Sequence, residues 1–199
     1  MREGDVILLQ TCAHNPSGID PTEEEWKKIS KSIQKQGVLT LFDFAYQGFA
    51  SGDMERDAFP IRQFESDGNQ MLVCQSFSKN FGIYSTRTGT LSVTTASPEE
   101  SDRVLSQLKI LIRPMYSNPP AYGAKVVAYI LADAERERVW REEVNQMASR
   151  VIQVRKELRD DLQMSGSVQN WDHIVKQIGM FCYSGLSPHH VRTLDFIWR

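Results

Sequence analysis

A lysine flanked by hydroxyl side chains is the most chemically suggestive feature of this sequence. Lys79 follows Ser76 and Ser78, and Arg87 comes shortly after it. Two hydroxyls and a guanidinium can hold a phosphate dianion, while a lysine amine beside them can form a Schiff base with an aldehyde. The alternative is an ordinary polar junction between a strand and a loop, with Lys79 exposed to solvent. Which interpretation holds depends on what the other elements bring to the same place.

Three predicted buried strands, over 6–9, 38–42 and 71–74, each end in polar residues. The first leads into a turn that contains Asn15, the second ends at Asp43, and the third leads into the segment with the lysine. Ligands of open α/β sheets bind beyond the carboxyl ends of the strands. We therefore expect these polar groups to converge on one crevice.

Each of these residues also has an ordinary structural explanation. Asn15 fits a plain turn residue, and an aspartate that ends a strand, such as Asp43, is often a helix or turn cap. Tyr46, in the glycine-rich loop after Asp43, fits a half-buried core aromatic, and Arg87 fits a surface ion-pair partner. The combination is far less frequent by chance than any one member.

Predicted helices alternate with these strands. A capping box at Thr22 and Glu25 begins the first helix, and Gly37 ends it. The further expected elements are a weakly helical piece over 54–66, a strand over 88–94, helices over 98–112, up to about 131 and over 134–163, a strand over 179–183 and a last helix from 187. Strands alternating with helices predict an α/β fold with a largely parallel sheet.

The long helix predicted over 134–163 has a single apolar stripe. Its members are Val144, Met147, Val151, Val154 and Leu158, spaced as one helical face. The stripe predicts a helix that packs on one side only, and such a helix could bridge two domains.

Composition narrows the class of protein. The 199 residues are 41% hydrophobic, and the net charge of −2 gives no sign of nucleic-acid or anionic-membrane binding. No apolar run reaches the length of a membrane span, and the acidic N-terminus predicts neither a signal nor a transit peptide.

The cysteines and histidines predict no metal site. Cys12, Cys74 and Cys182 are far apart, which favours free buried thiols in a reducing compartment over disulfides. The four histidines have no metal-ligand spacing.

Five blocks of sequence, in order, carry a family resemblance. They are Ala-His-Asn-Pro-Ser-Gly over 13–18, Asp-Phe-Ala-Tyr-Gln-Gly-Phe-Ala-Ser-Gly over 43–52, Ser-Phe-Ser-Lys-Asn-Phe-Gly over 76–82, Arg-Pro-Met-Tyr-Ser-Asn-Pro-Pro over 113–120 and Gln-Ile-Gly-Met-Phe over 177–181. The chain resembles the aspartate aminotransferases, pyridoxal-phosphate enzymes of fold type I. The resemblance implies an α/β fold with a mostly parallel sheet, and ping-pong transfer of an amino group between L-aspartate and 2-oxoglutarate.

The resemblance also implies a role for the residues around the cofactor ring. Lys79 would bind pyridoxal 5′-phosphate covalently and then move the substrate proton from Cα. Asp43 would pair with the pyridine nitrogen and keep it protonated. Asn15 and Tyr46 would form hydrogen bonds with the phenolic oxygen of the ring.

Further residues would bind the phosphate and the substrate. Ser76, Ser78 and Arg87 would hold the phosphate. Arg113 would bind the distal carboxylate of the substrate, reaching into the site of a neighbouring subunit of a homodimer, and Asn15 would also contact the substrate. A dicarboxylate-binding arginine argues against the other reactions open to such a cofactor, those of a racemase, decarboxylase or lyase. Without the resemblance, an exposed arginine before a proline is the simpler explanation for Arg113.

The sequence departs from the family pattern in two ways. Thr86 and Thr88 flank Arg87, where the family has an acid before the arginine and a small apolar residue after it. The chain also starts partway through the family's large domain and stops before its arginine for the α-carboxylate. We therefore expect a partial chain, with 1–145 in the large domain, and 146–199 as the interdomain helix and start of a small C-terminal domain. We expect the partial chain by itself to be inactive. The alternative function is a non-catalytic fragment that keeps the cofactor lysine. The expected compartment is the cytoplasm, with the mitochondrial matrix as the alternative.

Overall fold

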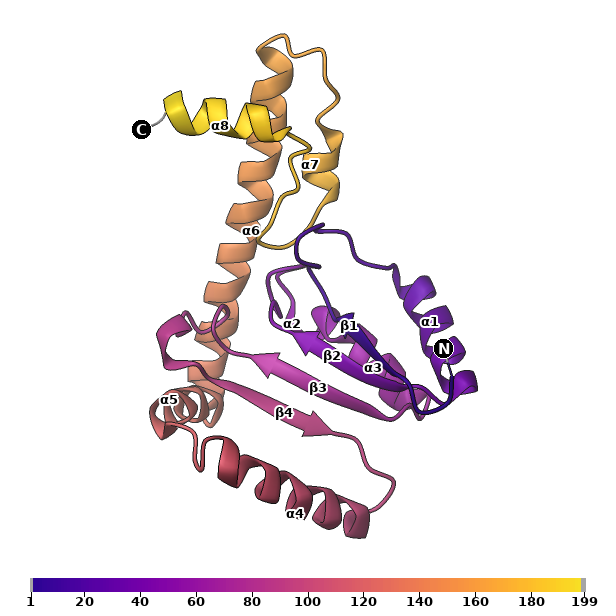
Figure 1. Ribbon diagram of the computed structural model, residues 1–199. Coiled ribbons are helices and arrows are strands. Elements are labelled where there is room, and N and C mark those ends of the chain that lie inside the picture. The colour runs from indigo at the N-terminus through magenta and orange to yellow at the C-terminus, as the bar shows by residue number, and fades with distance from the viewer. Residues whose placement is uncertain (1, 198–199) are drawn as a thin grey trace.

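Four strands form one sheet in the computed structural model, which describes residues 2–197 (Figure 1). The sheet order is β1-β2-β3-β4, and the strands are β1 (Val6–Gln10), β2 (Leu39–Phe44), β3 (Met71–Ser76) and β4 (Gly89–Val93). The first three strands are parallel and β4 is antiparallel to β3. The prediction of an α/β fold with a largely parallel sheet is therefore confirmed.

The helices follow the predicted order, with two additions. They are α1 (Glu23–Gln36), α2 (Met54–Asp57), α3 (Phe59–Ser66), α4 (Pro98–Met115), α5 (Ala121–Leu131), α6 (Ala134–Met164), α7 (Asp172–Lys176) and α8 (Pro188–Ile197). A short 3₁₀ turn over Tyr84–Thr86 precedes β4. Neither that turn nor α7 was predicted. The capping box of Thr22 and Glu25 is present at the start of α1, and Gly37 ends the helix with a φ of 62°.

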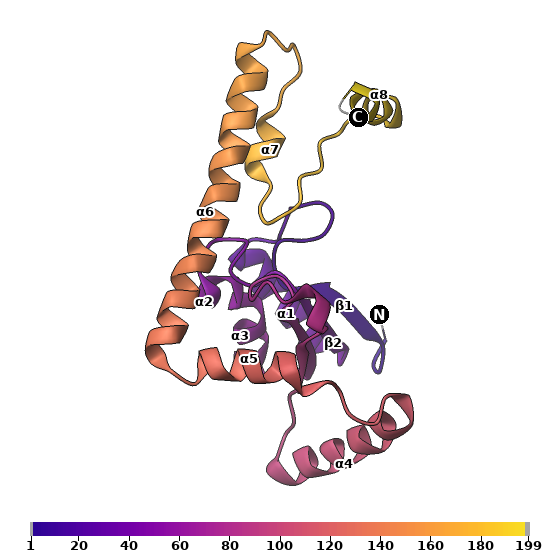
Figure 2. The ribbon, with the colours of Figure 1, turned by 90° about the vertical axis from the view of Figure 1, so that its left-hand side faces the viewer.

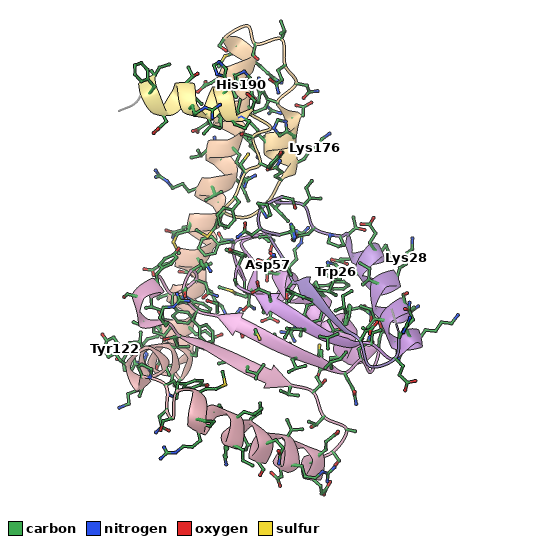
Figure 3. All side chains as sticks on the ribbon, viewed as in Figure 1. Trp26, Lys28, Asp57, Tyr122, Lys176 and His190 are labelled. Atoms are coloured by element: carbon green, nitrogen blue, oxygen red, sulfur yellow. The ribbon has the colours of Figure 1, made fainter. Side chains whose placement is uncertain are left out.

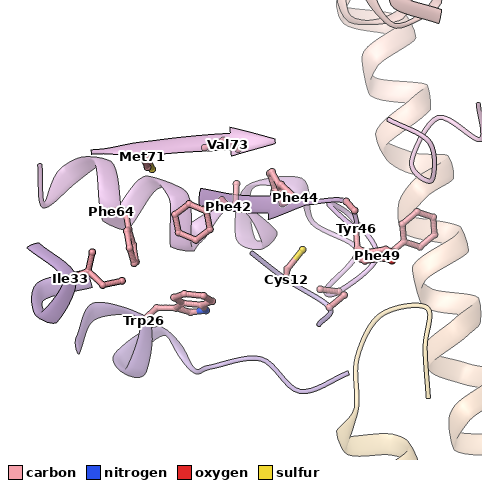
Figure 4. Close-up of a cluster of buried hydrophobic side chains, with 14 of the residues drawn as sticks. Cys12, Trp26, Ile33, Phe42, Phe44, Tyr46, Phe49, Phe64, Met71 and Val73 are labelled. Carbon is pink, nitrogen blue, oxygen red and sulfur yellow. The ribbon is translucent and has the colours of Figure 1, made fainter. Parts of the chain in front are cut away.

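The hydrophobic core lies between the sheet and the helices α1 and α3 (Figure 4). Phe42 of β2 meets Phe64 of α3 edge-on, with ring centroids 4.9 Å apart, and Trp26 of α1 packs against both rings. Figure 3 shows Lys28 pointing outward from the same helix whose Trp26 points inward. Because side chains alternate along a strand, the residue after Phe42 faces the other side of the sheet. That residue is Asp43, so the core fixes the face on which this carboxylate lies.

The other face of the sheet is partly bare. The side chains of Val6 and Leu8 on β1 are 60% and 64% exposed, and Leu91 on β4 is also exposed. We expected the strand over 6–9 to be buried, and that expectation is wrong. The helices cover only one face of the sheet, so the edge strand β1 buries only the side chains on that face.

The long helix α6 rises past the sheet, with α7 beside its upper half (Figures 1 and 2). The prediction that its apolar stripe is its packing face is mostly wrong, because Met147, Val154 and Leu158 are exposed. Of the stripe, Val144 is fully buried. The other buried residues of the helix are Ala148 and Arg155, on a neighbouring face. Whether 1–145 and 146–199 form separate domains stays a prediction.

Two further expectations are corrected. The segment over 179–183 is not a strand, because its backbone carbonyls accept hydrogen bonds from a side chain rather than from a neighbouring strand. Of the three thiols, only Cys12 is buried, and burial raises the pKa of that thiol. Cys74 and Cys182 are exposed, since one lies on the bare side of the sheet and the other in an irregular segment. Within residues 2–197, no helix is long and apolar enough to cross a membrane.

Candidate active site

Four of the predicted site residues line one hollow at the carboxyl end of the sheet. They are Asp43, Ser76, Ser78 and Arg87, and the hollow has a volume of about 260 Å³. Asp43 comes from the end of β2, the serines from the end of β3 and the turn beyond it, and Arg87 from just before β4. The structure thus brings Asp43 and the two serines, which come from successive strands as expected, into one hollow with Arg87.

A second group joins Lys79, Tyr46 and Asn15. The Nζ atom of Lys79 lies 4.9 Å from the centroid of the Tyr46 ring. The Tyr46 hydroxyl accepts a hydrogen bond of 3.3 Å from the amide nitrogen Nδ2 of Asn15. Tyr46 is buried, whereas Lys79 is only partly buried, so the ring forms a fixed wall beside a reachable amine. Lys79 directly follows Ser78 in the chain, which places this group next to the hollow.

The turn that carries Lys79 is held from two sides. The side chain of Asn80 donates a hydrogen bond to the carbonyl of Gln47, in the loop after Tyr46. The indole nitrogen of Trp140 on α6 donates to the carbonyl of Asn80 at 2.7 Å, and its ring stacks on Phe81 at 4.4 Å. The position of the lysine therefore depends on the long helix, a dependence that no local sequence pattern shows.

Arg87 has an unusual backbone conformation. Its φ of 50° lies in the left-handed region, which a residue with a Cβ seldom adopts and which is often retained at functional sites. One guanidinium nitrogen donates to the carbonyl of Tyr84 at 3.2 Å, and the side chain is otherwise open to solvent and the hollow. The turn is thus shaped so that a charged group projects where the strands end.

The threonines that depart from the family pattern pack under this turn. The hydroxyls of Thr86 and Thr88 lie 3.0 Å apart and share a hydrogen bond. Gly123 of α5 lies so close that a Cβ there would meet the Thr88 hydroxyl oxygen at 1.9 Å. The helix α5 therefore packs directly against the residues on both sides of Arg87, and only a glycine permits that approach.

Asp57 was missed by the sequence analysis, although it shapes the loop beyond Tyr46. This buried carboxylate accepts hydrogen bonds from the amides of Gly48, Ala50 and Ser51 and from the Ser51 hydroxyl. Burial raises the pKa of Asp57, and these hydrogen bonds oppose the rise. An acidic residue in a short polar helix gives no sequence signal of such a role.

Arg113 is not among the residues that line the hollow. It lies near the end of α4, is exposed, and donates a hydrogen bond to the hydroxyl of Ser117. Pro114 and Met115 continue the helix beyond the predicted end at 112.

The α/β fold with its mostly parallel sheet is that of the fold type I aminotransferases. The chain belongs to the aminotransferase class I and II family, whose model matches residues 1–197. It is 54% identical to a mitochondrial aspartate aminotransferase of Dictyostelium discoideum over 192 residues, which cover 96% of this chain and 45% of that protein.

Solved structures agree with this assignment. A mitochondrial aspartate aminotransferase from Trypanosoma brucei superposes with a TM-score of 0.95 at 47% identity, covering 98% of this chain and 51% of that one. Aspartate aminotransferase from Saccharomyces cerevisiae cytoplasm gives 0.92 at 43% identity, covering 98% of this chain and 49% of the other. The chain spans about half the length of the curated relatives that it matches.

Proposed function

We propose that this chain carries the cofactor lysine and phosphate-binding residues of a pyridoxal-phosphate-dependent aspartate aminotransferase. The reaction is ping-pong exchange of an amino group between L-aspartate and 2-oxoglutarate, giving oxaloacetate and L-glutamate. The observation that carries the proposal is the Lys79 amine beside Tyr46, next to a hollow lined by Asp43, the two serines and Arg87. The names of the similar proteins support the choice of aspartate.

The donor set fits pyridoxal phosphate. An aldehyde needs a primary amine, a phosphate needs hydroxyl and cationic donors, and a protonated pyridine nitrogen needs a carboxylate. Lys79, the pair Ser76 and Ser78 with Arg87, and Asp43 supply these groups at one end of the sheet. The Asn15–Tyr46 hydrogen bond supports the proposal that these two side chains together bind the ring oxygen.

The chain's own residues would divide the work as follows. When bound, the cofactor supplies an electron sink for the pair left behind as a proton leaves the substrate Cα. Lys79 would hold the cofactor and then take and return that proton with its free amine. Asp43 would keep the ring nitrogen protonated by offering it a negative charge. Ser76, Ser78 and Arg87 would anchor the phosphate, so that the ring cannot turn away from the lysine.

Substrate choice is assigned to Arg113 together with Asn15. Arg113 is exposed on α4 and away from its own chain's hollow, which is what a residue serving a second subunit requires. The proposal therefore includes a homodimer in which Arg113 of one protomer binds the distal carboxylate of a substrate held by the other. We propose the cytoplasm as the compartment, with the mitochondrial matrix as the alternative, since similar proteins come from both.

The alternative function is a non-catalytic chain that binds the cofactor and turns over nothing. The observation in its favour is the bare sheet face, where Val6 and Leu8 expose apolar surface next to the strands that carry the site. Such a surface favours self-association over an ordered pocket.

Chemical labelling tests both. Borohydride reduction in the presence of pyridoxal phosphate, followed by peptide mapping, should place the label on Lys79. Lys79→Ala should abolish the label and, in a chain of its relatives' full length, lower oxaloacetate formation from aspartate at least ~10³-fold, whereas Lys109→Ala on α4 should change neither. A label without turnover supports the non-catalytic alternative. A label on another lysine would overturn the assignment of Lys79.

A further inference from the structure

Arg155 of α6 is a buried cation whose described hydrogen-bond partners are all backbone carbonyls. Its side chain is 7% exposed, and its two terminal nitrogens donate to two carbonyls each. The acceptors are Ile174 at 3.1 Å, Gln177 at 2.9 Å, Gly179 at 2.7 Å, and Phe181. A guanidinium can satisfy four acceptors in this way because its donors lie in one rigid plane. It therefore gives the irregular segment after α7 a fixed shape without a strand partner.

One side of that segment touches the loop that carries Asn15. The amide of Ile178 donates to the carbonyl of Gly18 at 2.8 Å. A Cβ on Gly179 would lie 2.3 Å from the Cβ of Ala13, so the two backbones are in direct contact. Because the segment contacts the loop at both Gly18 and Ala13, a shift of the segment would displace both ends of the loop.

The other contact is with Tyr46. The ring of Phe181 meets the ring of Tyr46 at 90°, with centroids 5.6 Å apart. Tyr46 in turn lies beneath the Lys79 amine and accepts the hydrogen bond of Asn15. Arg155 thus donates to the backbone carbonyl of Phe181, and the side chain of Phe181 contacts Tyr46 of the candidate site.

We propose that Arg155 is a positioning residue that sets the Asn15–Tyr46 pair against the cofactor ring by fixing the segment over 177–181. The inference rests on the proposed function for its ligand, pyridoxal phosphate. Arg155 touches neither ligand nor reacting atoms, and it acts through Phe181 on Tyr46 and through Gly179 on the loop of Asn15. Its action is confined to the ring end of the site, because Ser76, Ser78 and Arg87 come from other elements.

A purely structural arginine would give a different result. If Arg155 only fastens α7 to α6, its loss lowers the stability of the whole chain and affects both ends of the site alike. If it positions the Asn15–Tyr46 pair, its loss alters the ring end and leaves the phosphate end intact.

The first readout needs no cofactor. The full chain is labelled with 3-fluorotyrosine, and the Tyr46 resonance is identified by its absence in Tyr46→Phe. Arg155→Met should shift or broaden that resonance, and Arg150→Met, at an exposed position of the same helix, should not. Arg155→Lys keeps the charge but cannot reach four carbonyls, so it should shift the resonance in the same direction even if the methionine variant folds poorly. An unchanged Tyr46 resonance in a folded Arg155→Lys chain would overturn the inference.

The second readout is binding. Equilibrium dialysis should show the affinity for pyridoxal phosphate falling about tenfold in Arg155→Met, as for one lost hydrogen bond, with the affinity for inorganic phosphate unchanged. In a Tyr46→Phe background the same substitution should have a smaller effect, because the two act through one contact. Equal losses for both ligands, or additive effects with Tyr46→Phe, would refute the inference. A wild-type chain that binds no pyridoxal phosphate would instead refute the proposed function, and the fluorine readout would still decide the role of Arg155.

Discussion

Replacing Gly123 by alanine should disturb the phosphate end of the site from a distance. The new Cβ would lie 1.9 Å from the Thr88 hydroxyl oxygen, 2.8 Å from that of Thr86 and 3.0 Å from the Thr88 Cβ, whereas ordinary contacts begin at 3.4 Å. Rotating Thr88 would place either its methyl group or its Cβ hydrogen where the hydroxyl lies. Only the second rotation relieves the closest contact, and it leaves the Thr88 Cβ at 3.0 Å and the Thr86 hydroxyl oxygen at 2.8 Å. The backbone of Thr88 is itself held by the amide of Phe77, which donates to its carbonyl at 3.1 Å. We therefore expect the remaining strain to move the turn that carries Arg87.

The magnitude follows from the displacement. Relieving the closest contact without rotating Thr88 requires about 1.5 Å of movement, the difference between 1.9 and 3.4 Å. Overpacking of this kind costs about 1–3 kcal/mol, and the better helix propensity of alanine returns about 1 kcal/mol. The net loss of folding free energy is thus small, about 0–2 kcal/mol. A displaced guanidinium loses a charge-assisted hydrogen bond to phosphate, about 1.5–3 kcal/mol, which weakens binding ~10- to ~150-fold.

The assay is calorimetric titration of Gly123→Ala with pyridoxal phosphate and with inorganic phosphate, alongside a denaturant curve. We expect both affinities to fall while the unfolding midpoint changes little. Adding Thr88→Ala removes the closest contact and should restore most of the affinity, with Thr88→Ala alone as the matched control. Normal phosphate affinity in Gly123→Ala, or no recovery in the double variant, would show that α5 does not position Arg87.

Three further predictions test other parts of the site and core. Arg113→Ala should lower kcat/KM for aspartate ~30- to ~1000-fold more than for an apolar amino acid, while the exposed Arg103→Ala on the same helix should affect neither; equal losses for both substrates would assign Arg113 a structural role. Burial holds the pKa of Asp57 above 3.8, so the folded state favours the protonated carboxyl, and this contribution is lost as the pH rises through the folded pKa. Asp57→Asn should therefore destabilise the chain more at pH 4 than at pH 6.5 in denaturant titrations, and the opposite trend would contradict the raised pKa. Leu8→Ser on the bare face should change the unfolding free energy by less than ~0.5 kcal/mol, against ~3–5 kcal/mol for Phe42→Ala, and a large loss for Leu8→Ser would show that this face is covered in solution.

The parts of the fold that depend on residues close together in the sequence were predictable. The capping box at Thr22 and the left-handed Gly37 bound α1 as their local chemistry requires. The meeting of Asp43 with Ser76 and Ser78 also followed from the sequence, because parallel strands end at the same edge, whereas Arg87 joins them because β4 is antiparallel and begins at that edge. What these residues bind remains a prediction, since proximity alone does not establish a ligand.

The parts that failed depend on partners distant in the chain. The apolar stripe of α6 predicted a packing face, but a periodic pattern does not show how far the sheet extends along a long helix. The segment over 179–183 has the composition of a strand. Its carbonyls at Gly179 and Phe181, which a strand would need for pairing, instead accept hydrogen bonds from Arg155. Gly123 gave no signal either, because its neighbours, Thr86 and Thr88, become neighbours only in the folded chain.

In three loops around the site, backbone groups form hydrogen bonds with a charged side chain instead of with a helix or strand partner. Asp20 accepts from the amides of Ala13 and His14, and Asp57 from three amides of the loop over 48–51. Arg155 donates to one carbonyl within α7 and to three carbonyls after it. These loops have no strand partners, and unpaired backbone groups in a buried place cost about 1–3 kcal/mol each. Each charged side chain therefore stabilises a single conformation of its loop. Neutral substitutions at these three positions should change the geometry of Asn15, Tyr46 and Lys79 before they unfold the sheet, since the core of Phe42 and Phe64 does not depend on them.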